Sequence, residues 1–150
     1  MIEEKYVDVV EEFLKKRGFQ TWKEVEPNEC KQWKNSYRVD LIFFKEEYGY
    51  IGVEFKNLRT TRQGGKIAKS IEQIRKKYIH MTYFENNIKI SKWCLCFDTS
   101  DYGDWISIDT ILHMSIFLKH FLNYYGLSFM EFEKYKIKID HSTKQSIIIQ

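Results

Sequence analysis

The sequence has few residues that interrupt or crosslink a chain: its 150 residues include one Pro, seven Gly and three Cys. An odd number of cysteines cannot be completely paired in disulfides, so we expect a reducing compartment. The scarcity of Pro and Gly excludes collagen-like and low-complexity chains, and 43% hydrophobic with 30% charged residues is typical of a soluble globular protein. We therefore expect residues 1–150 to form a single domain.

Long hydrophobic runs are also missing. The most apolar window, residues 106–125, is interrupted by Asp109, His113, Lys119 and His120, so no membrane-spanning helix is expected. The first thirteen residues are rich in acids and do not follow the pattern of a secretory signal. These absences favour a cytoplasmic protein.

The chain as a whole has no strong excess of charge of one sign, but one of its segments does. The formal net charge of +3 does not by itself imply a polyanionic partner. The segment from Arg59 to Lys77, however, contains seven Lys or Arg residues and one acid, Glu72, which gives seven minus one, or +6. The remainder of the chain is therefore net acidic, and any polyanion contact is expected in this segment.

The spacing of apolar residues predicts alternating helices and strands. We expect a first helix over 2–17, a strand over 19–26, an antiparallel hairpin of strands 38–44 and 50–55, a helix over 66–80, a strand over 92–97 and a helix from 109 or 110 to 126. The last residues are ambiguous, because 131–140 and 145–150 both have the composition of late strands. Cys94 and Cys96 alternate in the 92–97 strand, which predicts two small buried side chains on one face rather than zinc ligands.

Charged residues lie inside the predicted hairpin, where apolar residues would be expected. Asp40 is near the start of one strand, and Glu54 and Lys56 are two apart at the end of the other. Side chains alternate along a strand, so Glu54 and Lys56 point to one side while Val53 and Phe55 point to the other, and Asp40 can face the first pair. Buried charges require a partner or a metal ion.

A divalent cation would satisfy both carboxylates together. Hard cations prefer oxygen ligands, and the set offered here is Asp40, Glu54 and the backbone carbonyl of Phe55, which suits Mg²⁺ with Mn²⁺ as a substitute. A cation held in this way lowers the pKa of a bound water and binds a phosphodiester oxygen. Lys56 would orient the attacking water and stabilise the charge that develops on phosphorus oxygens.

The segments RVD at 38–40 and EFK at 54–56, thirteen residues apart and preceded by a helix, resemble the PD-(D/E)XK nuclease superfamily over residues 2–97. The resemblance implies an α/β, restriction endonuclease-like or Holliday junction resolvase-like fold, with an αβββαβ core whose central mixed sheet is flanked by helices. The 110–125 helix and the C-terminal strands would extend this core. The resemblance also implies that the protein is a Mg²⁺-dependent deoxyribonuclease that acts as an endonuclease, with Asp40, Glu54 and Lys56 as the core triad. Val39 stands where the family pattern has proline.

The family often adds another acid from the first helix or the first strand. Four residues compete for this place here: Glu11, Glu12, Glu24 and Glu26. Glu26 is favoured as an additional metal ligand because it closes the first strand two residues after Glu24.

The helix after the motif carries the predicted substrate contacts. Gln73 occupies the place where some family members have a glutamine that contacts the attacking water or the substrate, although Tyr78 follows it by five residues and so departs from the family's Q-x-x-x-Y pattern. Cations on the same helical stripe and in the preceding loop would bind DNA phosphates: Arg59, Arg62, Lys66, Lys69, Lys76 and Lys77.

Other interpretations of the same residues are open. Asp40 and Lys56 can form a cross-strand ion pair with Glu54 solvated on an open sheet face, and the basic stripe can be a solvated helix face. The chain can be a non-catalytic nucleic-acid-binding module of the same fold. A third class is an interaction protein that uses the 110–125 helix, whose apolar residues on more than one side would suit a homodimer contact. DNA structure, sequence preference, endo- or exonuclease action and RNA as a substrate are left open.

Overall fold

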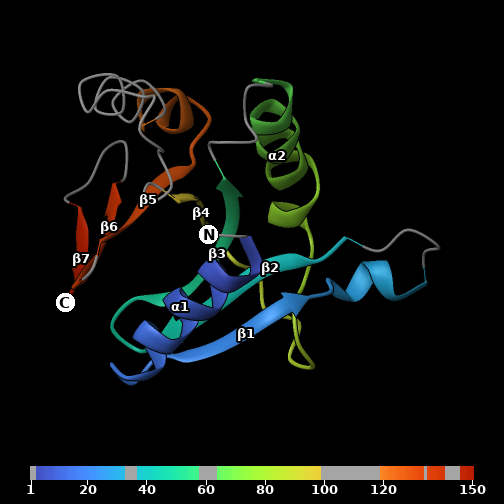
Figure 1. Ribbon diagram of the computed structural model, residues 1–150. Coiled ribbons are helices and arrows are strands. Elements are labelled where there is room, and N and C mark those ends of the chain that lie inside the picture. The colour runs from blue at the N-terminus through green and yellow to red at the C-terminus, as the bar shows by residue number, and fades with distance from the viewer. Residues whose placement is uncertain (1–2, 33–36, 58–63, 99–118, 134, 141–145) are drawn as a thin grey trace.

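The computed structural model describes residues 3–32, 37–57, 64–98, 119–133, 135–140 and 146–150 (Figure 1). Its helices are α1 (Glu3–Lys15) and α2 (Gly64–Lys76), with short 3₁₀ helices η1 (Asn28–Gln32) and η2 (Tyr78–His80). Residues 119–124 are also helical. The strands are β1 (Gln20–Val25), β2 (Val39–Lys45), β3 (Gly49–Asn57), β4 (Lys92–Asp98), β5 (Ser128–Glu133), β6 (Lys136–Asp140) and β7 (Ile147–Ile149).

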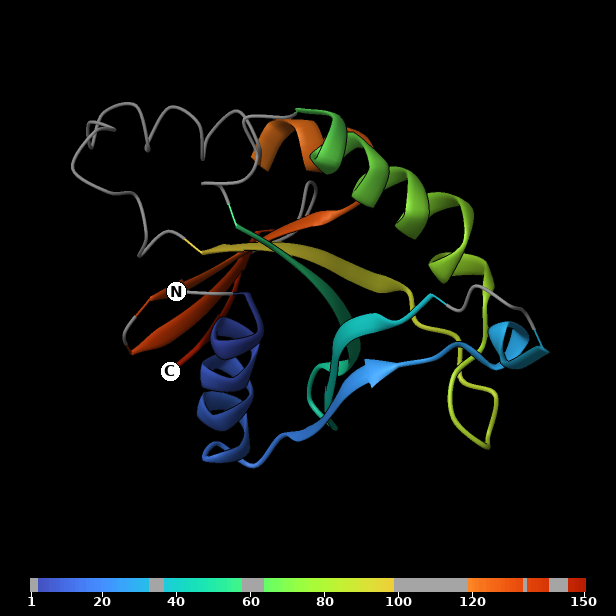
Figure 2. The same cartoon turned by 45° about the vertical axis from the view of Figure 1, so that its right-hand side comes forward.

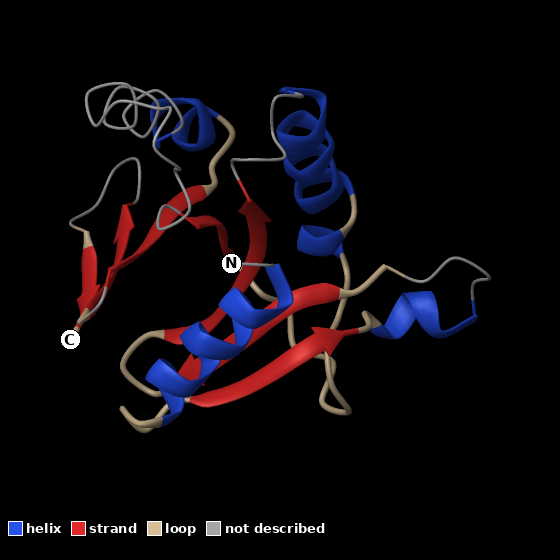
Figure 3. Cartoon of the chain, viewed as in Figure 1, coloured by secondary structure: helices blue, strands red, loops and turns tan. Residues whose placement is uncertain are grey.

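The strands form one mixed sheet whose spatial order follows the chain order from β1 to β7. The β1–β2 and β2–β3 pairs are antiparallel, the β3–β4 and β4–β5 pairs are parallel, and the β5–β6 and β6–β7 pairs are again antiparallel. The sheet is curled, so that β6 and β7 turn away from the plane of the central strands (Figures 2 and 3). An α/β architecture with a mixed sheet is therefore confirmed.

Helix α1 packs on the concave side of this sheet. Its apolar residues follow helical spacing, and Val10 and Leu14 are completely buried. They belong to a core cluster that contains Leu41 of β2, Val53 of β3 and also Ile137 of β6. The curl of the sheet thus lets one helix cover strands from both ends of the sheet. Figure 2 shows α1 on this side and α2 on the other.

A second core cluster lies on the opposite face under α2. Ile74 of α2 and Tyr78 of η2 pack there with Ile42 of β2 and Trp93 of β4. The Trp93 ring packs directly against β3 at Gly52, where a Cβ would lie 2.4 Å from the indole ring, so this packing requires glycine. The two clusters give β2 and β3 buried residues on both faces, so a charged residue in these strands enters an apolar environment.

Several predicted boundaries change. Helix α2 begins at Gly64 and ends at Lys76, because the chain tightens into η2 rather than continuing as one helix to residue 80. The 131–140 segment contains parts of two antiparallel strands, β5 and β6, instead of one. The predicted helix to residue 126 lies mostly outside the described residues, and so does most of the predicted homodimer surface at 110–125. Within the described ranges, no helix is long and apolar enough to cross a lipid bilayer.

Candidate active site

Asp40 and Glu54 lie opposite each other where the hydrogen-bonded ladder of β2 and β3 ends. The last pair in register is Leu41 with Val53, one step before the two acids. Beyond it the backbone N–H of Phe55 donates to Asp40 Oδ2 at 2.8 Å, and the backbone N–H of Asp40 donates to Glu54 Oε1 at 3.3 Å. Each carboxylate thus takes the place of a backbone acceptor, which fixes both acids to the neighbouring strand.

Burial and proximity raise the pKa of both acids of this pair. Glu54 is only 7% exposed, and burial together with the charge of Asp40 raises the pKa of Glu54 well above its ordinary value. Burial also raises the pKa of Asp40, while the hydrogen bond from the Phe55 amide and the charge of Lys56 lower it. In the metal-free protein we therefore expect the two groups to share a proton. The alternative with Glu54 solvated on an open sheet face is wrong, because Glu54 is buried.

Lys56 and Phe55 point to opposite faces of β3, as the alternation predicts. The Phe55 ring is buried beside α1, with its centroid 5.7 Å from that of Tyr6 in an edge-to-face contact. Lys56 is half-buried, and its charge lowers the pKa of Asp40 and of Glu54. The structure therefore brings Asp40 and Glu54 into contact, and Lys56, two residues after Glu54 on β3, acts on both carboxyl groups through its charge.

The pair of carboxyl groups fits a hard divalent cation. A proton shared between two buried acids occupies the position where a cation would neutralise both, and carboxylate oxygens are the ligands that Mg²⁺ prefers. Within the described part of the chain, no three His, Cys, Asp or Glu side chains group as metal ligands. A cation here would therefore have two carboxylates, with the carbonyl of Phe55 as the predicted third protein ligand, and would keep several waters, as Mg²⁺ commonly does.

Cys94 and Cys96 do not form a competing metal site. Both are completely buried in the α1 cluster, on the one face that their alternation predicts. Burial raises the pKa of the Cys94 thiol to about 12, which disfavours the thiolate that zinc requires. The interpretation of the two cysteines as small buried residues is confirmed.

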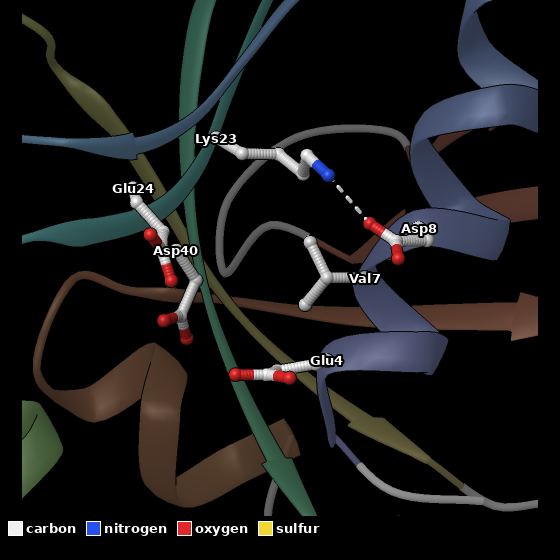
Figure 4. A pocket seen from close by; sticks show the side chains of 6 residues that line it. All are labelled: Glu4, Val7, Asp8, Lys23, Glu24 and Asp40. Atoms are coloured by element: carbon white, nitrogen blue, oxygen red, sulfur yellow. Dashed lines mark hydrogen bonds and ion pairs between the residues drawn. The ribbon is translucent and has the colours of Figure 1, made fainter.

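Asp40 opens onto a cavity of about 440 Å³ between α1 and β1 (Figure 4). Acids dominate the other side chains that line it: Glu4, Val7, Asp8, Lys23 and Glu24. Lys23 donates a hydrogen bond to Asp8 at 2.6 Å, so the positive charge of this lysine is already paired. Figure 4 shows Glu4 on one side of Asp40 and Glu24 on the other. The cavity is therefore negative and reaches solvent, as a cation site requires.

Of the four glutamates that the sequence offers as the additional acid, Glu24 is the one that lies beside Asp40. Its charge raises the pKa of Asp40, and it lies in register opposite Asp40, between the pairs Lys23–Leu41 and Val25–Val39. Its backbone is in the left-handed region at φ 49°, an unusual conformation for a residue with a side chain. Glu26, the acid favoured from the sequence, follows the end of β1 and is not among the described residues that line the cavity.

The two helical candidates lie farther along α1. Glu11 accepts a hydrogen bond from Thr21 at 3.0 Å, and the exposed Glu12 pairs with Lys16 at 3.8 Å. Sequence reasoning missed Glu4, which faces the cavity from the first turn of α1. The sequence did contain a signal for Glu4, because residues 4, 7, 8 and 11 share one helical face by their spacing.

Gln73 is connected to the strand that carries Asp40. Its side-chain Nε2 donates to Tyr78 Oη at 2.8 Å, and Tyr78 Oη donates to the backbone carbonyl of Arg38 at 3.0 Å. Gln73 and Tyr78, whose five-residue spacing departs from the Q-x-x-x-Y pattern, are therefore in contact. Gln73 is half-buried. Its amide is linked through the Tyr78 hydroxyl to the backbone of Arg38, two residues before Asp40.

The predicted phosphate-binding cations divide into three groups. Arg59 and Arg62 lie outside the described residues, as does the side chain of Lys66, whose backbone lies in the first turn of α2. Lys69 is exposed, and the exposed Lys76 pairs with Glu72 at 2.5 Å. Lys77 donates to the hydroxyl of Tyr37 and lies 3.6 Å from the centroid of that ring. Lys77 is therefore part of the internal contacts of the protein, while Lys69 and Lys76 are at the surface.

Comparisons with known proteins find remote structural similarity. No protein-family model matches the chain, and no curated protein matches it. An XisH family protein from Nostoc punctiforme is 13% identical, with a TM-score of 0.45 over 85% of this chain and 90% of that chain. The SPO1766 protein of unknown function from Silicibacter pomeroyi is 11% identical, with a TM-score of 0.42 over 94% of this chain and 68% of that chain. Similarity at this level carries no argument about function.

Proposed function

We propose that this protein is a Mg²⁺-dependent nuclease that hydrolyses DNA phosphodiester bonds, and that it acts as an endonuclease. The observation that carries the proposal is the pair of buried carboxyl groups, Asp40 and Glu54, joined across two strands with Lys56 beside them. Burying two like charges together is unfavourable unless a cation or proton compensates them. A pair of this kind, one member of which lines a cavity, is therefore a candidate active site.

Each residue has a distinct role in this proposal. Asp40 and Glu54 would hold the cation, with the Phe55 carbonyl as a further ligand and Glu24 or Glu4 binding its waters from the cavity side. Lys56 would orient the attacking water and stabilise the negative charge that develops on the phosphate. The cation, when bound, lowers the pKa of a coordinated water and neutralises a phosphate oxygen.

The arrangement of elements supports the same assignment. In the described ranges a helix, three antiparallel strands, a second helix and a parallel strand follow in the order α1, β1, β2, β3, α2 and β4. This order supports the proposal of an αβββαβ core like that of the resembled superfamily, and α1 and α2 contribute to clusters on opposite faces of the sheet. The position of the acids at the β2–β3 hairpin supports the same proposal.

The test is cleavage of supercoiled, linear and branched DNA by purified protein with Mg²⁺ or Mn²⁺. We expect cleavage that EDTA abolishes and that falls by about 10²- to 10⁴-fold in Asp40→Asn and Lys56→Ala. Glu12→Gln, an exposed acid on the far part of α1, is the matched control and should cleave normally. Metal-independent DNA binding without cleavage by the wild type would instead support the non-catalytic binding module.

A further inference from the structure

The segment that leads into β2 is held by α2 and η2 at two successive residues. Tyr37 bonds to Lys77 through its hydroxyl, and the carbonyl of Arg38 accepts from Tyr78. Two residues later, Asp40 makes its reciprocal hydrogen bonds with β3. The position of the Asp40 carboxylate therefore depends on a short stretch of backbone whose other end is fixed from α2 and η2.

Tyr78 is buried and fully used as a hydrogen-bonding group. Its ring is stacked on Trp93 with centroids 5.5 Å apart, and its exposed fraction is 0%. The hydroxyl accepts from Gln73 and donates to Arg38, which is its full complement of one donor and one acceptor bond. Burial, then the charges of Glu54 and Asp40, raise the pKa of Tyr78, so the hydroxyl stays protonated.

We infer that Gln73 and Tyr78 form a positioning relay, from Gln73 Nε2 through Tyr78 Oη to the Arg38 carbonyl, which sets the place of the Asp40 carboxylate opposite Glu54. Gln73 orients the tyrosine hydroxyl, because the hydroxyl that accepts from the amide must direct its own hydrogen to Arg38. The inference deepens the proposed function, since it concerns the same acids, but it assigns Gln73 a role through Tyr78 rather than contact with substrate.

The structure also supplies a matched control. Tyr83 is another completely buried tyrosine that contacts Trp93, and its hydroxyl donates to a backbone carbonyl, that of Tyr78, at 2.8 Å. Tyr83→Phe and Tyr78→Phe each remove one buried hydroxyl from the same core cluster. In Tyr83→Phe the Tyr78 carbonyl keeps the Met81 amide as a donor, whereas Tyr78→Phe leaves both the Arg38 carbonyl and the Gln73 amide without their partner. Both are expected to lower the melting temperature, Tyr78→Phe by more. They differ in that only the Tyr78 hydroxyl is bonded to the chain leading into β2.

The experiment measures amide hydrogen exchange by NMR on metal-free wild type, Tyr78→Phe, Tyr83→Phe and Gln73→Leu, at conditions of equal global stability. The Phe55 amide reports the place of the Asp40 carboxylate directly, because that carboxylate is its acceptor. We expect its protection to fall about tenfold in Tyr78→Phe and by less in Gln73→Leu, and to stay within about twofold of the wild type in Tyr83→Phe. Equal protection in the Tyr78 and Tyr83 variants would overturn the relay.

Calorimetric titration with Mn²⁺ separates this inference from the proposed function. If the wild type binds Mn²⁺, Tyr78→Phe should bind about five- to tenfold more weakly than Tyr83→Phe, because residues that orient metal ligands affect affinity. If the wild type binds no Mn²⁺, the proposed function fails, while the exchange data still decide whether the relay positions Asp40. Should Tyr78→Phe not fold, Gln73→Leu decides: unchanged Phe55 protection in that variant would also overturn the relay.

Discussion

Replacement of Glu54 by Gln should stabilise the metal-free protein and abolish its stabilisation by metal. Glutamine has the size of glutamate and retains an oxygen that accepts from the Asp40 amide, so the packing and this hydrogen bond are kept. The substitution removes an acid that is 7% exposed and that must take up a proton, or carry a charge beside a second carboxylate, when the chain folds. We expect a gain of about 1–2 kcal/mol at neutral pH, since either state is costly for a group that is ionised in the unfolded chain.

The magnitudes are large enough to measure by thermal denaturation. For a chain of 150 residues, 1 kcal/mol corresponds to about 2–4 °C in Tm. Mn²⁺ at about one hundred times its Kd should stabilise the wild type by about 2.7 kcal/mol, or about 5–11 °C, and should not stabilise Glu54→Gln. The order of stability of the two proteins therefore reverses when the metal is added.

The pH dependence has a definite sign. Folding raises the pKa of Glu54, so the folded state binds more protons than the unfolded state at pH values between the two pKa values. The free energy of unfolding of the wild type therefore falls as the pH rises from the unfolded pKa through the raised one, and Glu54→Gln lacks this loss. The stability difference should shrink as the pH falls from 8 towards about 4.5. A pH-independent difference, or a metal-free variant less stable than the wild type, would refute this reasoning.

Three further predictions concern packing, the cavity and the surface cations. Gly52→Ala should lower the free energy of unfolding by about 1–3 kcal/mol in denaturant titrations, because its Cβ would overlap Trp93; a loss below 0.5 kcal/mol would contradict this contact. Glu4→Gln should weaken Mn²⁺ binding about threefold by calorimetry while leaving Tm unchanged, whereas equal affinity would remove Glu4 from the site. Lys69→Ala should reduce the salt dependence of DNA binding by about one in the slope of log K against log salt, and an unchanged slope would place phosphate contacts elsewhere.

The hairpin and its three charged residues were predictable because the signal is local. Alternation in a strand fixes which side chains share a face, and the turn at residues 45–49 brings the two strands together in one register. The buried strand with Cys94 and Cys96 was predictable for the same reason. Three charged residues in otherwise apolar strands were sufficient to locate the candidate site.

The surrounding contacts depend on how distant segments pack, which spacing within one element does not encode. Glu24 lies beside Asp40 through the register of β1 with β2, whereas the sequence favoured Glu26 because it closes the predicted strand. The link from Gln73 through Tyr78 to β2 required the chain to tighten into η2 after α2, which places Tyr78 five residues after Gln73 in contact with it. A continuous helix would have placed these two side chains on different faces.

The most direct test of the central claim is anomalous X-ray diffraction from a crystal soaked in Mn²⁺. The account predicts a single strong anomalous peak within coordinating distance of carboxylate oxygens from both Asp40 and Glu54, with Lys56 nearby. A peak confined to surface acids such as Asp8 or Glu12, or the absence of any peak at the β2–β3 pair in a well-ordered crystal, would contradict it.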